Sequence, residues 1–295
     1  MGKLWFRALM YAARRGLTNW MPDELYLKIL YRGRVGKKLN LDNPNTFNEK
    51  MQWLKIHNRT PELTAMVDKY EAKSYVSDRI GSEYIIPTLG VWDCFDNIDF
   101  DSLPNQFVLK CTHDSGGLVI CNDKATLNIP EAKAKIERCM KQNYYYLNRE
   151  WPYKNVKPRI IAEEYMIDSK LQELRDYKFF CFGGEAKFFK IDMDRQTRHR
   201  ANYYTIDKVL MPVGEVAFPP DFNKEVIFPS KMDLMIELAE KLSKNQPFLR
   251  VDFYEVNNRV YFGELTFYPA SGVGKWTDER YDKKFGEWID LSAVH

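Results

Sequence analysis

The fold of this chain is decided by LRVDF at residues 249–253 and YFGELT at residues 261–266. Both runs alternate in the manner of strands, and the polar break between them holds Asn257-Asn258, a pair suited to a tight turn. The stretch therefore predicts a β-hairpin. Side chains on one face of a sheet repeat every two residues, so folding near Asn257-Asn258 brings Asp252 and Glu264 side by side.

The two carboxylates of this hairpin repel each other unless a positive group lies between them. Hard oxygen ligands around a divalent cation with bound phosphate, most often Mg²⁺, are the simplest explanation. The alternative is an ordinary exposed hairpin with both acids on its solvent face. Patterns elsewhere in the sequence distinguish these two interpretations.

The composition is that of a soluble globular protein, with 295 residues of which 45% are hydrophobic and 29% charged. That length allows two domains or one large domain. No apolar run approaches the roughly 18–20 residues that span a bilayer, and no signal peptide is recognisable. The cysteines are odd in number, scattered and without CxxC spacing, which favours reduced thiols over disulfides or zinc. They are Cys94, Cys111, Cys121, Cys139 and Cys181. A cytoplasmic protein is the expectation.

The net charge of +3 is unevenly distributed, because residues 1–38 carry +7 and the remainder −4. The same segment holds apolar residues at near-helical intervals, Trp5 and Trp20 among them. One interpretation is an amphipathic surface for anionic lipid or a lipid-linked substrate, placing the protein at the inner face of the cell membrane. The other is a set of helices docked on the main body with solvated basic faces. A nucleic-acid partner is not expected, since no recognised binding motif accompanies the charge.

The order of predicted elements indicates an α+β fold in which antiparallel sheets dominate the second half. Residues 1 to about 65 read as helices, with Thr46 as an N-cap. Further helices are predicted at 69–80, 130–148 and 231–244. Strands are predicted at 85–92, 107–111, 118–120, 159–166, 177–182 and 186–193, in addition to the opening hairpin.

Lys110 lies near the end of a predicted strand, directly before a loop that contains Ser115, Gly116 and Gly117. A lysine supplies positive charge for phosphate, and the amides of such a loop supply hydrogen bonds to its oxygens. The pattern is not the GxxxxGK[ST] loop, so a Walker-type site is excluded. Taken alone, the same residues are explained more simply by a plain hairpin turn.

Four further patterns place charge where a ligand could meet it, although each also has a plain surface explanation. They are Lys69 and Lys73 one turn apart after Asp68, the acids of Glu163-Glu164-Tyr165-Met166 at a strand end, Asp176 and Lys178 on one strand face, and a basic loop at Arg198–Asn202.

The succession of these patterns along the chain resembles the ATP-grasp superfamily. Within it, the chain is most similar to the teichuronopeptide-biosynthesis (TupA-like) type, found in surface-polysaccharide gene clusters. The segments that carry the resemblance are PNTFNEKMQWLK at 44–55, VDKY at 67–70, LKCTHDSGG at 109–117, DYKFFCFGG at 176–184 and RVDFY at 250–254. They cover about residues 39 to 290.

The resemblance implies a role for each candidate residue. Lys73 and Lys110 would bind the phosphates of ATP, and Ser115-Gly116-Gly117 would cover them. Glu163-Glu164-Tyr165-Met166 would be the adenine hinge, with Asp176 and Lys178 in the same nucleotide site. Asp252 and Glu264 would hold Mg²⁺. Thr266 stands where the family has an Asn as third ligand, and its hydroxyl binds Mg²⁺ more weakly than an amide carbonyl. Arg250 and Arg200 would steady an acyl phosphate.

The implied fold is an ATP-grasp fold in which two α+β subdomains hold ATP between antiparallel sheets. The expected divisions are a basic helical segment at 1–67, a first subdomain at 68–165 and a second at 166–295.

The implied activity is that of an ATP-dependent carboxylate–amine ligase, joining an acidic sugar or glycan precursor to an amine such as an amino acid or amino sugar. A glycosyltransferase remains an alternative function, because the chain contains Asp192-Met193-Asp194 and Asp-x-Asp at a strand end is typical of nucleotide-sugar sites. A scaffold protein that binds ATP without hydrolysing it is a second alternative, because Thr266 stands where the family has an Asn.

Overall fold

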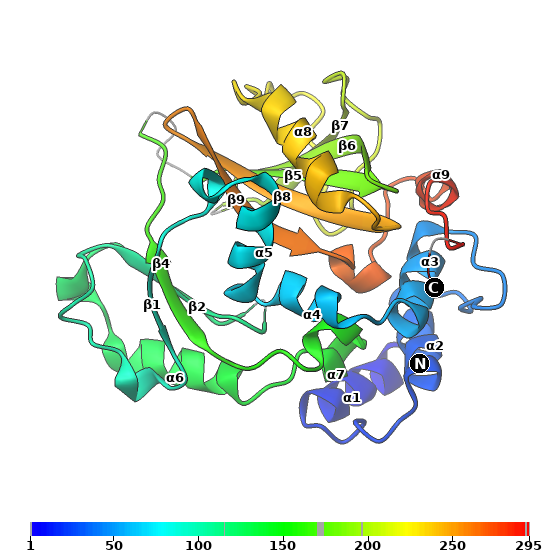
Figure 1. The fold of residues 1–295 in the computed structure, drawn as a ribbon. Helices are drawn as coiled ribbons and strands as arrows, with labels where there is room; N and C mark the ends of the chain where they lie inside the picture. Colours follow the sequence, from blue (N-terminus) through cyan, green and yellow to red (C-terminus); the bar gives the residue numbers. More distant parts are fainter. Residues whose placement is uncertain (1, 115, 170–173, 196, 293, 295) are drawn as a thin grey trace.

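A computed structural model describes residues 2–114, 116–169, 174–195, 197–292 and 294 of the chain. Residues 2–67 contain four helices, in agreement with the helical start that was predicted (Figure 1). These are α1 Gly2–Arg14, α2 Asp23–Arg34, α3 Phe47–His57 and α4 Pro61–Val67. The predicted cap of α3 is confirmed, because the side chain of Thr46 accepts from the amide of Glu49 while the Glu49 carboxylate accepts from the amide of Thr46. Among the described residues, no helix has the length and apolar character needed to cross a bilayer.

A four-stranded antiparallel sheet in the order β1-β4-β2-β3 follows helix α5. Its elements are α5 Glu71–Ile80, β1 Thr88–Trp92, β2 Phe107–Cys111, β3 Leu118–Cys121 and β4 Ile160–Glu164. Helix α6, Ile129–Met140, packs on β2 and β3. The prediction of one helix over 130–148 is wrong. The helix stops at Met140, and Asn143 begins α7, Tyr145–Asn148, by accepting a hydrogen bond from the amide of Tyr145.

A larger antiparallel sheet has five strands in the order β7-β6-β5-β8-β9. These are β5 Asp176–Phe182, β6 Glu185–Met193, β7 Arg200–Thr205, β8 Phe248–Val256 and β9 Arg259–Thr266. The hairpin predicted around Gly183-Gly184 is confirmed, and both glycines have positive φ. The basic loop predicted at Arg198–Asn202 is wrong from Arg200 onward. The run RANYYT pairs with β6 over Phe188–Met193, and its two tyrosines suit a strand.

The opening hairpin is confirmed as strands β8 and β9. Asn257 and Asn258 both have positive φ, as the two central residues of a type I′ turn require. The strands pair regularly from Val256–Arg259 up to Phe253–Phe262, and the register then shifts by one residue. Gly263 is the extra residue of this β-bulge, and Asp252 pairs with Glu264 beyond it. The bulge, and not the turn alone, places the two carboxylates opposite each other.

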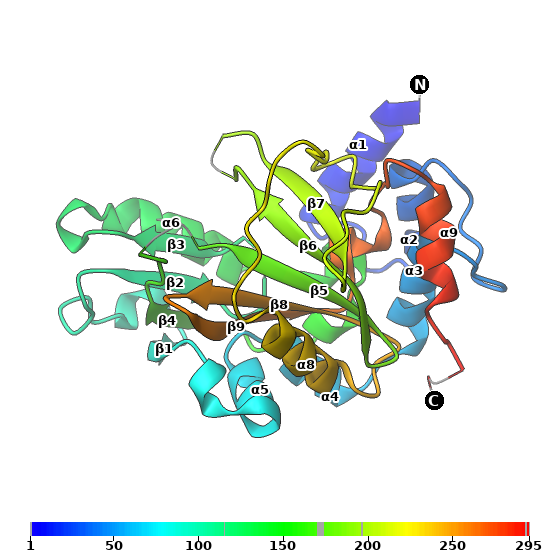
Figure 2. The same cartoon turned by 90° about the horizontal axis from the view of Figure 1, so that it is seen from above.

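The two faces of the larger sheet have different surroundings. One face carries Phe179, Val251 and Phe253 and is covered by α8, Met232–Ser243 (Figures 1 and 2). The other face is apolar at one end, where Phe180 and Phe188 stack and Phe188 packs against Phe285 of α9, Arg280–Glu287. Its opposite end carries Lys178 and Asp252. A sheet face that changes from aromatic to charged along its strands is positioned to border a polar site.

The apolar residues form three clusters. The largest joins the five-stranded sheet, α8 and α9 with α3, α4 and α5. The second lies within the four-stranded sheet and α6, and the third within α1 and α2. Helices α3 and α4 therefore share a core with the larger sheet, whereas the boundaries predicted at 67 and 165 stay a prediction.

Candidate active site

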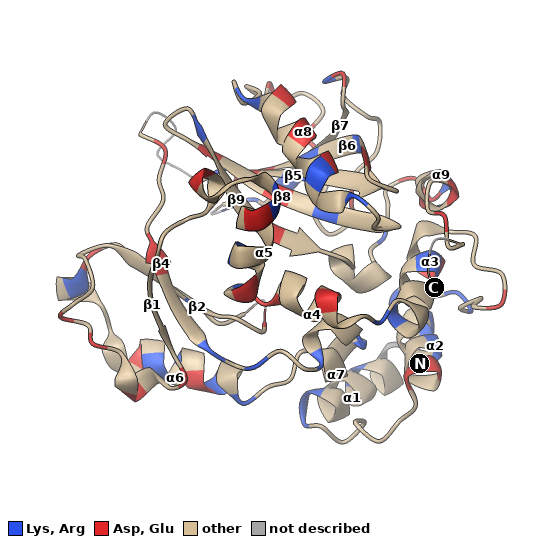
Figure 3. Ribbon diagram, in the orientation of Figure 1, with Lys and Arg blue, Asp and Glu red and all other residues tan. Residues whose placement is uncertain are grey.

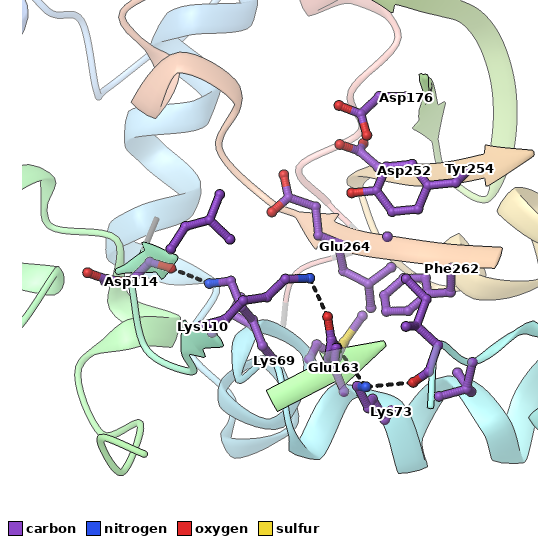
Figure 4. Close-up of a pocket in the computed structure, with 18 of the residues that line it drawn as sticks. Lys69, Lys73, Lys110, Asp114, Glu163, Asp176, Asp252, Tyr254, Phe262 and Glu264 are labelled. Carbon is purple, nitrogen blue, oxygen red and sulfur yellow. Dashed lines mark hydrogen bonds and ion pairs between the residues drawn. The ribbon is translucent and has the colours of Figure 1, made fainter. Parts of the chain in front are cut away.

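A cavity of about 330 Å³ lies between the two sheets, and residues of both sheets and of α5 line it (Figure 4). Figure 4 shows Lys69, Lys73, Lys110 and Glu163 on one side, and Asp176, Asp252, Tyr254 and Glu264 on the other. Eight of the residues predicted for the site line this cavity. They are Lys73, Lys110, Gly117, Glu163, Asp176, Lys178, Asp252 and Glu264. Lining residues from Met66 to Leu265, 199 positions apart in the sequence, thus meet around one space.

Glu163 organises the side formed by the smaller sheet. Its Oε1 lies 2.6 Å from Lys73 Nζ, and its Oε2 pairs with Lys110 Nζ. Val108 is the direct partner of Glu163 on β2, so Lys110 is its diagonal neighbour on the same face. Burial alone would raise the pKa of Glu163, but Lys110 and Lys73 together lower it below its ordinary value. One buried carboxylate thus holds two ammonium groups at the cavity wall.

Lys73 is fixed by backbone as well as by charge. Its Nζ donates to the carbonyl of Ile86 at 2.7 Å and to Thr88 Oγ1 at 2.8 Å. Burial lowers the pKa of Lys73, and the carboxylate of Glu163 opposes that shift. The ammonium therefore points into the cavity from α5 with its position set by three partners.

The glycine loop after β2 approaches the same space. The amide of Gly117 donates to both carboxylate oxygens of Asp114, at 3.0 and 3.1 Å. A Cβ on Gly117 would lie 2.4 Å from Cys111 Sγ, so only glycine fits there. A Cβ on Gly116 would have its nearest neighbour, Asp114 Oδ2, at 3.8 Å. Gly116 does not line the cavity. Ser115 lies outside the described residues.

Lys178 is the central cation on the side formed by the larger sheet. Its Nζ lies 2.9 Å from Asp176 Oδ2, 3.0 Å from Asp252 Oδ2 and 3.5 Å from Asp192 Oδ2. Burial would lower the pKa of Lys178, but Asp252 and Asp176 together raise it well above its ordinary value. Arg195 also reaches Asp176, at 2.5 Å. These residues form a network of alternating charge on this face of the sheet.

Arg250 bridges the two predicted metal ligands. Its Nη2 lies 2.7 Å from Asp252 Oδ2 and 2.7 Å from Glu264 Oε1, and its Nε donates to Asp252 Oδ1 at 2.7 Å. Burial would raise the pKa of Asp252, but Arg250 and Lys178 lower it. Thr266 Oγ1 lies 3.3 Å from Glu264 Oε1, so the hydroxyl belongs to the same group.

This arrangement fits Mg²⁺ in its donor atoms. Asp252 and Glu264 are hard carboxylate ligands that share one bridging position, which is filled here by a cationic nitrogen of Arg250. Among the described residues, no three His, Cys, Asp or Glu side chains converge as a metal site. Mg²⁺ is commonly held by one or two carboxylates together with substrate phosphates and water.

Several predicted residues are not brought to the cavity. Glu164 follows Glu163 on β4, so its side chain points to the other face of the sheet, where it is exposed. Tyr165 and Met166 follow the end of β4 and do not line the cavity. Glu163 is therefore the member of the predicted hinge whose side chain meets the site.

Arg200 lies on the wrong face of the larger sheet to join Arg250. It pairs with Met193, next to the Asp192–Ala201 pair on the face of Lys178. Alternation turns Arg200 away from that face, and its Nη1 donates to the carbonyl of Pro220 at 3.1 Å. Its neighbour His199 is on the charged face instead, with Nε2 3.0 Å from Asp192 Oδ1. The position of Arg200 gives no support to a role at the reacting atoms.

Fourteen of the 22 residues that line the cavity were not predicted as site residues, and Lys69, Arg195 and Tyr254 are among them. Lys69 donates to the carbonyl of Asp114, and its spacing from Lys73 was a signal that the sequence offered. Arg195 and Tyr254 also line the cavity. Arg195 follows β6 in an irregular segment, and nothing in its local sequence indicates the contact with Asp176.

The Asp192-Met193-Asp194 pattern does not form a shared carboxylate site. Asp192 is buried against Lys178, Lys190 and His199. Asp194 has a φ of 53° and pairs with Lys224 at 2.6 Å. The two acids thus have separate partners, unlike a pair that holds one metal ion.

Comparison with known proteins identifies the family. A model of the TupA-like ATP-grasp family matches residues 49–290. No curated protein matches the chain. Similar solved structures include N5-carboxyaminoimidazole synthetase from Staphylococcus aureus, with 15% identity and a TM-score of 0.38 over 68% of this chain and 44% of that one.

Two D-alanine–D-alanine ligases are similar to the same degree. The enzyme from Bacillus anthracis, complexed with ATP, has 13% identity and a TM-score of 0.41 over 74% of this chain and 55% of that one. The enzyme from Helicobacter pylori has 14% identity and a TM-score of 0.43 over 85% and 66%. The chain thus spans between 44% and 66% of the length of these structures. The family model covers most of the chain, and the chain belongs to the TupA-like ATP-grasp family.

Proposed function

We propose that this protein is an ATP- and Mg²⁺-dependent carboxylate–amine ligase of surface-polysaccharide biosynthesis. The observation that carries the proposal is the pairing of two charge clusters across one cavity. Lys73 and Lys110 meet at Glu163 on one side, and Arg250 meets Asp252 and Glu264 on the other. Membership of an ATP-grasp family supports ATP as the nucleotide.

The cavity lining supports a nucleotide with its base and phosphates in different places. Ile85, Ile86 and Phe262 provide apolar surface for a base, and Lys73 and Lys110 provide positive charge for phosphates. Among the described residues, Glu163 is the one acid that forms an ion pair with either ammonium group. A polyphosphate would therefore add negative charge where two cations share one carboxylate. Bound Mg²⁺ would supply further neutralisation of phosphate charge at Asp252 and Glu264.

The residues fit a two-step amide synthesis. A carboxylate oxygen of the acceptor attacks the γ-phosphorus of ATP, the bond to the bridging oxygen breaks, and ADP leaves. An amine then attacks the carbonyl carbon of the acyl phosphate, phosphate leaves, and the amine loses a proton. Arg250 would stabilise the charge that develops on the transferred phosphoryl group. The glycine loop at Gly116-Gly117 would limit the access of water to the acyl phosphate.

The substrates are proposed from the TupA-like resemblance. The acceptor would be an acidic sugar, such as a uronic acid, in a surface glycan or its precursor, and the amine an amino acid or amino sugar. The use of ATP favours a cytoplasmic location.

A turnover assay tests the proposal. The protein is incubated with Mg²⁺–ATP and a matrix of uronic acids and amines, with ADP release as the first readout and the mass of an amide product as the second. We expect Lys110→Ala and Glu264→Gln each to lower turnover by about 10²–10³-fold. Lys110→Ala removes positive charge from the phosphates, and Glu264→Gln removes a carboxylate that would hold the Mg²⁺ on which their neutralisation depends. Lys135→Ala and Glu131→Gln on α6, both exposed, are the matched controls.

Two outcomes contradict the ligase. Release of a nucleoside diphosphate from a nucleotide sugar without ATP would identify a glycosyltransferase. Tight ATP binding without turnover for every pair of acceptor and amine would identify a nucleotide-binding scaffold.

A further inference from the structure

Large exposed apolar side chains are concentrated near the start of the chain. Between residues 4 and 25 the structure exposes six of them, out of fourteen among the described residues. They are Leu4, Trp5, Tyr11, Leu17, Trp20 and Leu25. Trp20 and Leu17 are 77% and 63% exposed, although they are followed by a well-packed helix. A surface that gathers apolar side chains in this way marks an interaction site.

The packing of α1 on α2 does not bury these side chains. Phe6, Met10 and Met21 point inward to the cluster formed with Tyr26 and Leu30, and the ring of Phe6 rests on Gly33. The outward side of α1 carries Leu4 and Tyr11, seven residues apart and therefore on one face. The two interpretations of this segment are thus compatible, because the helices dock on the body and still expose an apolar face.

The charge of the same segment is of one sign. The first 22 residues contain Lys3, Arg7, Arg14 and Arg15 and no Asp or Glu. The side chains of Arg7, Arg14 and Arg15 are exposed, and Figure 3 draws no acidic residue on α1. Arginines among exposed Trp and Leu side chains match the two layers of a membrane surface, anionic headgroups above acyl chains.

We propose that the outer face of α1 and the turn that follows it, residues 4–20, binds the surface of an anionic lipid bilayer. Trp5, Leu17 and Trp20 enter the boundary between headgroups and acyl chains, and Arg7, Arg14 and Arg15 pair with lipid phosphates. Helix α1 lies at the outer edge of the molecule in Figure 2, so the body does not obstruct a flat surface there.

The attachment of this face to the body is rigid. Arg149, which is fully buried, donates through Nη2 to the carbonyls of Thr18 and Met21 at 2.8 and 3.2 Å. Asp23, at the start of α2, accepts from the hydroxyl of Tyr145 at 2.6 Å. The turn that carries Leu17 and Trp20 is therefore held by residues 145–149, which fixes the orientation of the whole molecule on the membrane.

Co-sedimentation of the full chain with vesicles tests the proposal. Vesicles of neutral phosphatidylcholine are compared with vesicles in which part of that lipid is replaced by phosphatidylglycerol. We expect binding to the anionic vesicles and little to the neutral ones. Leu17→Ser with Trp20→Ser, and separately Arg14→Ala with Arg15→Ala, should each weaken binding by about tenfold or more. All four residues are exposed, and thermal unfolding of each variant verifies its fold.

Matched controls come from elsewhere on the surface. Phe222→Ser with Ile227→Ser removes exposed apolar side chains, and Lys135→Ala with Arg138→Ala removes exposed charge, without touching α1. Retained binding in these controls supports the proposal. The proposal is overturned if the wild-type protein does not bind anionic vesicles or binds neutral vesicles equally well. It is also overturned if the control variants lose binding to the same extent as the test variants. A dimer without lipid that dissociates in the Leu17→Ser, Trp20→Ser variant would assign the face to a second copy instead.

Discussion

Arg250 occupies the position between Asp252 and Glu264 that a divalent cation would take, with Nη2 2.7 Å from an oxygen of each. We predict that Arg250→Met lowers the free energy of unfolding by roughly 3–5 kcal/mol in the absence of divalent cations, because buried Asp252 loses its main partner. Millimolar Mg²⁺ should then raise the thermal midpoint of Arg250→Met more than that of wild type, since the metal no longer competes with the guanidinium.

The matched control for Arg250 is Arg259→Met in the same hairpin, where the exposed guanidinium lies over the ring of Tyr261. Its response to Mg²⁺ should equal that of wild type. If Mg²⁺ shifts the midpoint of Arg250→Met by no more than it shifts that of the control, Asp252 and Glu264 are not the metal ligands.

The ion pairs of Glu163 with Lys110 and Lys73 make the stability of the folded protein fall at low pH. Its pKa is lowered in the folded protein, so it contributes stability above its unfolded pKa near 4.5, and that stability is lost as the pH falls through the folded pKa. We predict that Glu163→Gln costs roughly 3–5 kcal/mol at pH 7 and progressively less below pH 4.5. Urea unfolding of both proteins across this range measures the difference.

Glu164→Gln is the control for Glu163, because the neighbouring carboxylate is exposed on the other face of β4. It should change the free energy of unfolding by less than about 0.5 kcal/mol at any pH. A pH-independent loss in Glu163→Gln would mean that packing, and not the charge held between Lys73 and Lys110, explains its effect.

At the scale of the element, the bulge at Gly263 sets the geometry of the hairpin. A Cβ there would lie 3.0 Å from the carbonyl oxygen of Asp252 and 3.1 Å from the ring of Tyr254. We predict that Gly263→Ala lowers the free energy of unfolding by about 1–3 kcal/mol and weakens the Mg²⁺-dependent rise in thermal midpoint. Gly116→Ala adds a Cβ whose nearest neighbour would be 3.8 Å away, so it should leave the free energy of unfolding and the Mg²⁺ response unchanged. Equal behaviour of the two variants would show that the bulge tolerates a side chain.

The hairpin also shows which structural features its sequence determines. Alternation and Asn257-Asn258 predicted both strands and the turn, because these depend on local backbone preferences. Regular pairing about that turn would set Gly263 opposite Asp252 and turn Glu264 to the other face. The adjacency of the two acids was therefore predicted correctly, but the bulge that produces it was not. Strand β7 was missed for a related reason, since its polar start at Arg200 becomes a strand by pairing with Met193.

At the scale of the whole molecule, the family resemblance predicted the two-sheet architecture and eight of the 22 residues that line the cavity, because its motifs mark the ends of strands that meet there. Sequence alone did not predict the side chains that enter the site from irregular segments. Arg195 reaches Asp176 only once β5 and β6 are paired. Lys69 reaches the carbonyl of Asp114 only once its own amide bonds the carbonyl of Thr112 after β2. The same holds for Arg149, whose contacts join segments more than 120 residues apart.

Arg149 links α1 and α2 to the rest of the molecule through buried polar contacts. Its side chain is fully buried, its Nε lies 3.2 Å from Asp23 Oδ1, and its guanidinium stacks over the ring of Tyr26 at 4.3 Å. We predict that Arg149→Met, which keeps much of the volume but removes the charge and hydrogen bonds, lowers the cost of detaching α1 and α2 by roughly 3–5 kcal/mol. Limited trypsin cleavage after Arg14 and Arg15 should then be at least about tenfold faster than in wild type. Arg138→Met, an exposed change on α6, should leave the rate unaltered. Cleavage at the wild-type rate in Arg149→Met would mean that apolar packing and the remaining polar contacts, such as that of Asp23 with Tyr145, hold the helices without the buried guanidinium.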